Sequence, residues 1–162
     1  MGGSMAMNVS VTPEKLAVLL GQILGRTVRA QKVAPTAPSP AGSSLAAIYE
    51  TDNSEITTVC LSDLALAANS GAALCLIPPD RTKESIQAGN LEDLLLENFR
   101  EVLNILSQLF TISGPGRVKL KSVCKASQLC AEASKLISSP ARRLDMKLSI
   151  DGYGDGRMSV FS

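Results

Sequence analysis

The sequence predicts an α+β fold in which an antiparallel sheet packs against long helices. Two patterns support this prediction. Apolar residues recur at helical spacing in several segments, and short strand-like runs bounded by turn residues lie between and after them. Short hairpin connections between such runs favour an antiparallel sheet with helices on it. The chain has 162 residues, of which 45% are hydrophobic, so it has the length and the apolar content of one domain with its own core.

The N-terminal part is predicted to contain one amphipathic helix and a loop. Residues 1–6 are typical of an expression scar, so the domain is taken as 7–162. Thr12 can cap a helix whose first position suits a proline, and leucine and isoleucine then recur at helical spacing. Residues 33–44 contain three prolines among small residues and are expected to form a linker or an ordered surface loop.

Two strands joined by a turn are expected next. They cover 45–50 and 55–61, and the four residues between them have the composition of a turn. Residues 62–71 leave helix and strand both open, because their alanines favour a helix whereas their neighbours favour a strand. The short apolar run 72–77 is expected to be a buried strand, which a pair of prolines ends.

The middle of the chain is predicted to hold two helices. The first covers 81–88 and ends at Gly89. The second is the longest of the chain and runs from Leu91 to about Thr111, with Asn90 as its cap.

The C-terminal part is predicted to hold three strands and one helix. A strand at 118–123 is followed by a short helix at 129–137. Apolar and polar residues alternate over 144–150, which is the clearest strand pattern in the chain. The glycine-rich segment 151–156 is expected to be the turn of a hairpin, whose second strand is 157–161.

Composition argues against several classes of function. Histidine is absent, which removes the commonest general base and the commonest zinc ligand, and no metal or cofactor is expected. Net charge is +1 without a basic patch, and the cations from Arg117 to Lys125 alternate as on a solvated strand, so nucleic acid is not expected as a partner. No apolar run is long enough for a bilayer, so no membrane partner is expected. Four cysteines without a CxxC pair favour free thiols and a cytoplasmic setting.

The polar face of the predicted long helix is the candidate functional surface. The side opposite to its apolar stripe carries Glu97, Glu101, Asn104 and Gln108. Glu101 and Asn104 are three residues apart, so their side chains are neighbours on the helix surface. The plain interpretation is a solvated face, because most charged helix faces are only that. The alternative is a docking surface on which Glu101 pairs with a cation and Asn104 orients a water molecule.

A resemblance to a known family rests on this helix. The segment from Glu97 to Asn104 reads ENFREVLN and places Glu-x-x-Asn on a long amphipathic helix. A strand pair and a short helix precede it, a strand follows it, and a hairpin with Gly-Tyr-Gly closes the chain. In this order of elements, residues 45–162 resemble the CheC/CheX/FliY phosphatases of bacterial chemotaxis.

The resemblance implies a CheC/CheX-like fold and two residue roles. Glu101 would pair with a lysine of the phosphorylated response regulator CheY. Asn104 would position the water that attacks the aspartyl phosphate, and the regulator would supply its own metal ion.

Two positions depart from the family's motif. Glu97 stands where Asp or Ser is usual, and Leu103 stands where Gly is frequent. We therefore expect a non-catalytic module that binds a response regulator, another signalling protein or a second copy of the chain, with Glu97 and Gln108 as partner-binding residues. The alternative is an aspartyl-phosphate phosphatase that acts through Glu101 and Asn104.

Overall fold

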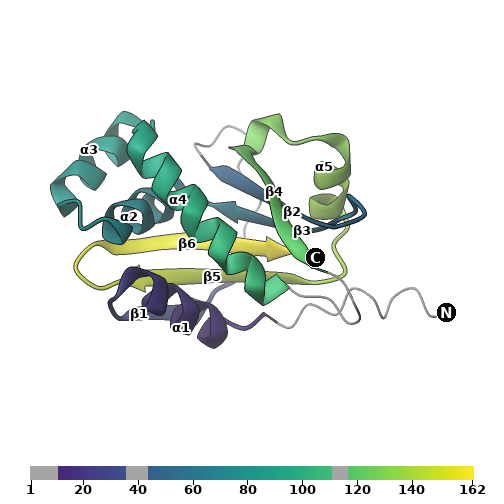
Figure 1. Cartoon of the computed structure of the whole chain (residues 1–162), viewed down its shortest axis with the longest axis horizontal. Coiled ribbons are helices and arrows are strands. Elements are labelled where there is room, and N and C mark those ends of the chain that lie inside the picture. The colour runs from purple at the N-terminus through teal and green to yellow at the C-terminus, as the bar shows by residue number, and fades with distance from the viewer. Residues whose placement is uncertain (1–10, 36–43, 111–116) are drawn as a thin grey trace.

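The computed structural model describes residues 11–35, 44–110 and 117–162, which form a six-stranded antiparallel sheet with helices on both faces (Figure 1). The order of strands across the sheet is β1-β5-β6-β3-β2-β4. The strands are β1 (Val28–Lys32), β2 (Leu45–Thr51), β3 (Ile56–Ser62), β4 (Val118–Lys125), β5 (Arg143–Ile150) and β6 (Gly154–Phe161). The α+β fold class predicted from the sequence is confirmed.

Five α-helices and two short 3₁₀ segments accompany the sheet in the described part of the chain. The helices are α1 (Pro13–Leu24), α2 (Leu64–Leu74), α3 (Pro79–Ala88), α4 (Asp93–Leu106) and α5 (Ala131–Ser138). The 3₁₀ segments are η2 (Ser107–Phe110) and η3 (Ala126–Gln128). No described helix is long and apolar enough to cross a membrane.

The two faces of the sheet carry different amounts of the core. The larger face packs against α1, α2 and α4, and its buried strand residues include Tyr49, Cys60, Met146 and Leu148. The opposite face packs against α5 through Ala133, and its smaller core consists of Ala46, Ile48, Val59, Leu61 and Phe161. Neighbouring residues of one strand alternate between these cores, which is the period-two pattern of a strand buried on both faces.

Several predicted elements are confirmed with small shifts of their bounds. The hairpin of β2 and β3 and the strand β5 lie where the sequence placed them. Helix α3 ends at Gly89, which has the left-handed conformation with φ 68°. The long helix stops at Leu106, and the 3₁₀ segment η2 continues it to Phe110. Most of the predicted 33–44 loop, and residues 1–6, lie outside the described residues.

The prediction of a strand at 72–77 is wrong. The segment continues α2, which begins after Asp63, whose carboxylate accepts the N–H of Leu66 at 2.8 Å. The helix closes where the N–H of Ile77 bonds to the carbonyl of Ala72 at 2.9 Å. Because α2 is buried on almost every side, its sequence is apolar all round, and such a run does not reveal its period. The sequence left helix and strand open for residues 62–71, and the structure shows a helix from Leu64 onward.

The structure differs from the sequence-based expectations at three further places. The strand β1 was not predicted, because its sequence, VRAQK, is short and mostly polar, as suits an edge strand paired only with β5. Asn90 does not cap α4; its N–H bonds to the carbonyl of Ser85 and closes α3, whereas α4 starts after Glu92 without a side-chain cap. The predicted turn 151–156 is shorter, since β6 already begins at Gly154.

Helix α2 lets α4 approach closely because it is built from small residues. A Cβ atom added to Gly71 would lie 2.4 Å from the carbonyl oxygen of Leu95 in α4, which is closer than nonbonded atoms can pack. The contact between α2 and α4 also contains a hydrogen bond from Asn98 Nδ2 to the carbonyl of Gly71 at 2.8 Å. The position of α4 on α2 therefore depends on the missing side chain at Gly71.

We predict that Gly71→Ala lowers the free energy of unfolding. The higher helix propensity of alanine alone would raise the free energy of unfolding by up to about 1 kcal/mol. The clash with Leu95 should outweigh that gain and leave a net loss of about 1–3 kcal/mol. Denaturant unfolding measures the difference. Ser70→Ala is the matched control, because the buried Ser70 hydroxyl has no hydrogen-bond partner among the described residues and its loss should cost nothing. Equal stability of Gly71→Ala and the parent would show that α4 does not depend on this contact.

Candidate functional site

The apolar stripe of α4 determines which residues face outward. Its buried residues are Leu95, Phe99, Val102, Leu103 and Leu106, spaced three, four and one residues apart as on one face of a helix. Helix α4 lies across the molecule in front of the sheet in Figure 1, between α2 and α1. Its outward face is therefore presented along its whole length.

Two hydrogen bonds hold α4 in this rotation. The hydroxyl of Tyr49, in β2, donates to the backbone carbonyl of Leu103 at 2.7 Å in a buried position. Nearer the start of the helix, Asn98 donates to the carbonyl of Gly71. The ring of Phe110 packs edge-on against Tyr49, with centroids 4.7 Å apart. Sheet, α2 and η2 thus all contact the inner side of α4.

The change from α-helix to 3₁₀ geometry at Ser107 makes the Tyr49 bond available. The backbone N–H of Ser107 bonds to the carbonyl of Asn104 instead of the carbonyl of Leu103, four residues back. The Ser107 hydroxyl donates to the same Asn104 carbonyl at 2.6 Å. The Leu103 carbonyl therefore accepts from a side chain of the sheet, which satisfies a buried acceptor at the end of the helix.

The structure brings the four predicted site residues together on the exposed side of α4 and η2. All four are exposed: Glu97, Glu101, Asn104 and Gln108. Leu103 is 1% exposed and faces the core. Neither Glu101 nor Asn104 has a side-chain hydrogen bond or an ion pair within the described part of the chain. Both side chains are thus open to a partner. Their catalytic role stays a prediction.

Carboxylates form a ridge along this face. Asp93, Glu97 and Glu101 follow one another at four-residue spacing and are all exposed. Like charges at this spacing destabilise a helix by about 0.2–0.5 kcal/mol per pair. No cation of the described chain pairs with any of the three. Arg100, exposed three residues after Glu97, offsets part of this repulsion without forming an ion pair. The ridge keeps an excess of negative charge, which is complementary to positive charge from outside.

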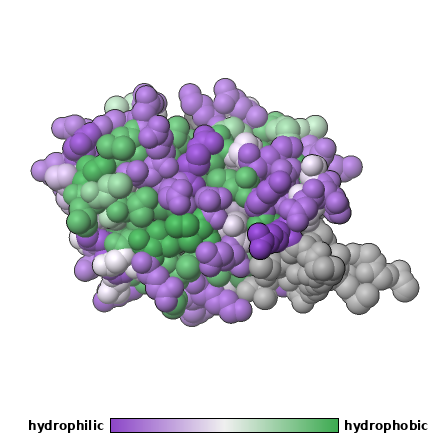
Figure 2. Space-filling model, viewed as in Figure 1, coloured by the Kyte–Doolittle hydropathy of each residue, from purple (hydrophilic) through white to green (hydrophobic). Residues whose placement is uncertain are grey.

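An apolar groove continues the ridge at its C-terminal end. The groove lies between α1 and η2, has a volume of about 440 Å³, and is lined mainly by the apolar atoms of Val18, Leu19 and Leu109 beside Gln108. Val18 is 62% exposed, although it is a large apolar residue. Figure 2 shows apolar side chains gathered where α1 meets α4, with hydrophilic residues around them.

Sequence reasoning did not find this groove. The apolar stripe of the first helix predicts its buried face, and Val18 lies outside that stripe. Leu16, Leu20 and Leu24 are the buried residues of α1, so Val18 is half a turn away from them. An apolar residue on the polar side of an amphipathic helix was the available signal.

Comparisons with known proteins give a fold but no family. No protein-family model matches the chain, and no curated protein matches it. Among solved structures, the FliM–SpeE complex from H. pylori matches with a TM-score of 0.61 at 11% identity, over 92% of this chain and 80% of that chain. The FliM middle domain from H. pylori matches with a TM-score of 0.54 at 13% identity, over 92% and 83% of the two chains. The FliG–FliM complex from H. pylori matches with a TM-score of 0.52 at 12% identity, over 91% of this chain and 84% of that chain.

The matches establish a shared architecture. FliY, CheX and CheC-like structures also match, with lower TM-scores of 0.46, 0.39 and 0.42. The α+β fold predicted from the sequence is thus confirmed, and the chain shares the fold of the FliM middle domain. At these identities the matches concern the fold and say nothing about the roles of Glu101 and Asn104.

We predict that Tyr49→Phe destabilises the protein by about 1–3 kcal/mol, because it leaves the buried Leu103 carbonyl without a donor. Denaturant unfolding measures the loss, and hydrogen exchange of the α4 amides locates it. Tyr153→Phe is the control: its hydroxyl bonds to the carbonyl of Ile77 at the same 2.7 Å, but in a partly buried position that water can reach. An equal loss in both variants would contradict a special role for the Tyr49 bond.

We also predict that Glu101→Lys stabilises the protein. The change removes the repulsion with Glu97 and creates a Glu97–Lys pair in the favourable order, which together amount to about 0.5–1 kcal/mol. Thermal or denaturant unfolding at low salt measures the gain, and about half of it should appear in Glu101→Gln. A loss of stability in either variant would show that Glu101 already has a cation partner in the fold.

Proposed function

We propose that this chain is a non-catalytic docking module that binds a signalling or motor protein in the cytoplasm. The observation that supports the proposal is the continuity of the carboxylate ridge on α4 with the apolar groove beside α1. A solvated helix face needs no exposed valine next to it, whereas a binding surface combines an apolar anchor point with charges at its rim.

The apolar atoms and the charges of this surface indicate which kind of partner it binds. The partner presents a segment with one or two apolar side chains for the groove at Val18 and Leu109. Next to them it carries Lys or Arg residues for Glu97 and Glu101. Since the ridge lies on α4 and the groove lies between its 3₁₀ continuation η2 and α1, the segment follows α4 lengthwise and ends beside α1. Opposite charges at the rim mainly raise the association rate and select the partner.

The comparisons support this choice of partner class. Two matching structures are complexes, one of FliM with SpeE and one of FliM with FliG. This support is an analogy at the level of the fold, because one fold can serve different functions.

A response-regulator phosphatase is the second candidate. It is favoured by the exposure of Glu101 and Asn104, one turn apart and without partners in the described chain. In this candidate Asn104 holds a water in line with the aspartyl phosphate of the regulator. The absence of histidine does not oppose it, because a carboxamide positions water without taking its proton.

We predict that a partner binds the parent protein and loses affinity when the surface is changed at either end. The candidates are CheY-like response regulators and FliG-like proteins of the same genome, purified and titrated by calorimetry. Glu101→Lys reverses the charge of the ridge and Val18→Asp places a charge in the groove, and each should weaken binding by about tenfold or more. Glu55→Lys, on the exposed turn between β2 and β3, is the matched control because it makes the same change of charge as Glu101→Lys, and it should bind like the parent.

Binding that is equal in the parent and both surface variants would contradict the proposed surface, provided that their unfolding curves show intact folds. The same regulators, phosphorylated, test the second candidate. Dephosphorylation that the parent accelerates and Asn104→Ala does not would establish the phosphatase in place of the non-catalytic module.

A further inference from the structure

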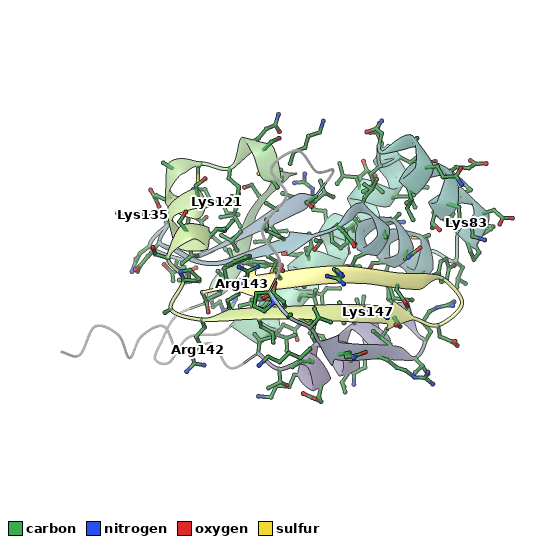
Figure 3. All side chains as sticks on the ribbon, turned by 180° about the vertical axis from the view of Figure 1, so that it is seen from behind. Lys83, Lys121, Lys135, Arg142, Arg143 and Lys147 are labelled. Carbon is green, nitrogen blue, oxygen red and sulfur yellow. The ribbon has the colours of Figure 1, made fainter. Side chains whose placement is uncertain are left out.

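A second hollow lies away from α4, between α3, the start of β1 and the turn of the β5–β6 hairpin. Its volume is about 460 Å³, which is within the usual range of about 300–1,000 Å³ for small-molecule sites. Pro79 and Lys83 of α3 line one side, and Thr27, Arg29 and the hairpin turn line the other. In Figure 3, Lys83 lies beside the end of the β5–β6 hairpin, although α3 and the hairpin are far apart in sequence.

The charge of the lining favours an anion. Arg29 and Lys83 come from different elements, and neither has an ion-pair partner within the described residues. Asp151 is the one acidic residue of the lining. The nearby Asp155 is held by Ser149, which also lines the hollow, and by the ammonium group of Lys147, 3.4 Å away; both lower the pKa of its carboxyl.

The wall formed by the hairpin turn is held in place by its neighbours. The Tyr153 hydroxyl donates to the carbonyl of Ile77 at 2.7 Å, and its ring lies under the guanidinium of Arg26, 4.8 Å from the centroid. Arg26 also donates to the carbonyl of Asp151 at 2.8 Å, and the Asp151 N–H bonds to the carbonyl of Thr27. A site whose walls are already ordered loses less entropy on binding.

Two glycines shape the backbone of this wall. Gly152 has φ 83°, and a Cβ atom there would lie 3.0 Å from Nη1 of Arg26, so a side chain would disturb the contact that holds the turn. Gly154 also lines the hollow without a side chain. The missing side chain at Gly152 therefore lets Arg26 lie against the turn and keep this wall in place.

The first turn of α3 adds a smaller contribution. The helix begins at Pro79, which lines the hollow, and no side chain caps its N-terminus. The positive end of the helix dipole is therefore directed toward this region, although Asp80 in the first turn offsets part of it. This contribution has the same sign as that of Arg29 and Lys83.

We propose that this hollow binds a small molecule that carries a phosphate or carboxylate group, with Arg29 and Lys83 as its two cationic contacts. The site shares no residue with the α4 ridge or its groove. It is a second binding function of the chain, and it does not depend on the function proposed for α4.

Titrations of the ¹⁵N-labelled protein by NMR test the proposal, with inorganic phosphate, AMP and citrate as probes. We expect at least one probe to saturate below about 10 mM and to shift the amide signals of Gly152 and Gly154. The three probes separate a phosphate site from a carboxylate site. The variant with Arg29→Gln and Lys83→Gln should weaken that binding by about tenfold or more.

The matched control removes two exposed cations from the other edge of the sheet, through Lys119→Gln and Lys125→Gln on β4. It has the same net charge as the test variant and should bind within about twofold of the parent. An equal loss in both double variants would overturn the proposal, because it would show attraction to net charge alone. Shifts spread over all basic residues, or no saturation by any probe, would overturn it as well.

Discussion

The hydrogen bond from Tyr49 to Leu103 is the contact on which the orientation of the candidate surface depends. It joins β2, an interior strand of the sheet, to the last turn of α4, one residue before Asn104. Burial raises the pKa of the Tyr49 phenol well above its ordinary value, so the hydroxyl remains a donor at any pH near neutrality. Because successive helical residues are about 100° apart, holding Leu103 inward turns Asn104 outward. Glu97 and Glu101 then follow on the same side.

Close packing turns this orientation into a rigid surface. Gly71 allows the backbone of α2 to touch that of α4, and Asn98 ties the two helices together. A helix seated by backbone contacts cannot slide to accommodate a partner, so the partner must fit the ridge and the groove as they are. That suits a docking module, since a surface that is ordered beforehand loses little entropy on binding. The remaining repulsion along Asp93, Glu97 and Glu101 is then a small cost of keeping charge ready for the partner.

The sequence predicted the elements in which apolar and polar residues recur with a clear helical or strand period. It missed elements without such a pattern. The stripe of α4 and the alternation in β5 are plain because one side of each element meets water. Helix α2 is buried all round, so its alanines and leucines were divided between an open segment and a wrong strand. Four exposed residues of the polar face of α4 and η2 were predicted, without Asp93 of the ridge. The groove at Val18 depends on how α1 packs beside η2, which no local pattern encodes.

The two proposed surfaces are connected by one small cluster of the core. Ile77 packs with Leu95 of α4 and with Ala72 of α2, and Tyr153 contacts the same cluster from the hairpin turn. The carbonyl of Ile77 accepts the Tyr153 hydroxyl, so the residue that seats the start of α4 also anchors the wall of the anion hollow. A well-packed cluster of this kind tolerates little displacement of its members. It therefore holds the wall of the hollow and the start of α4 in a fixed position relative to each other.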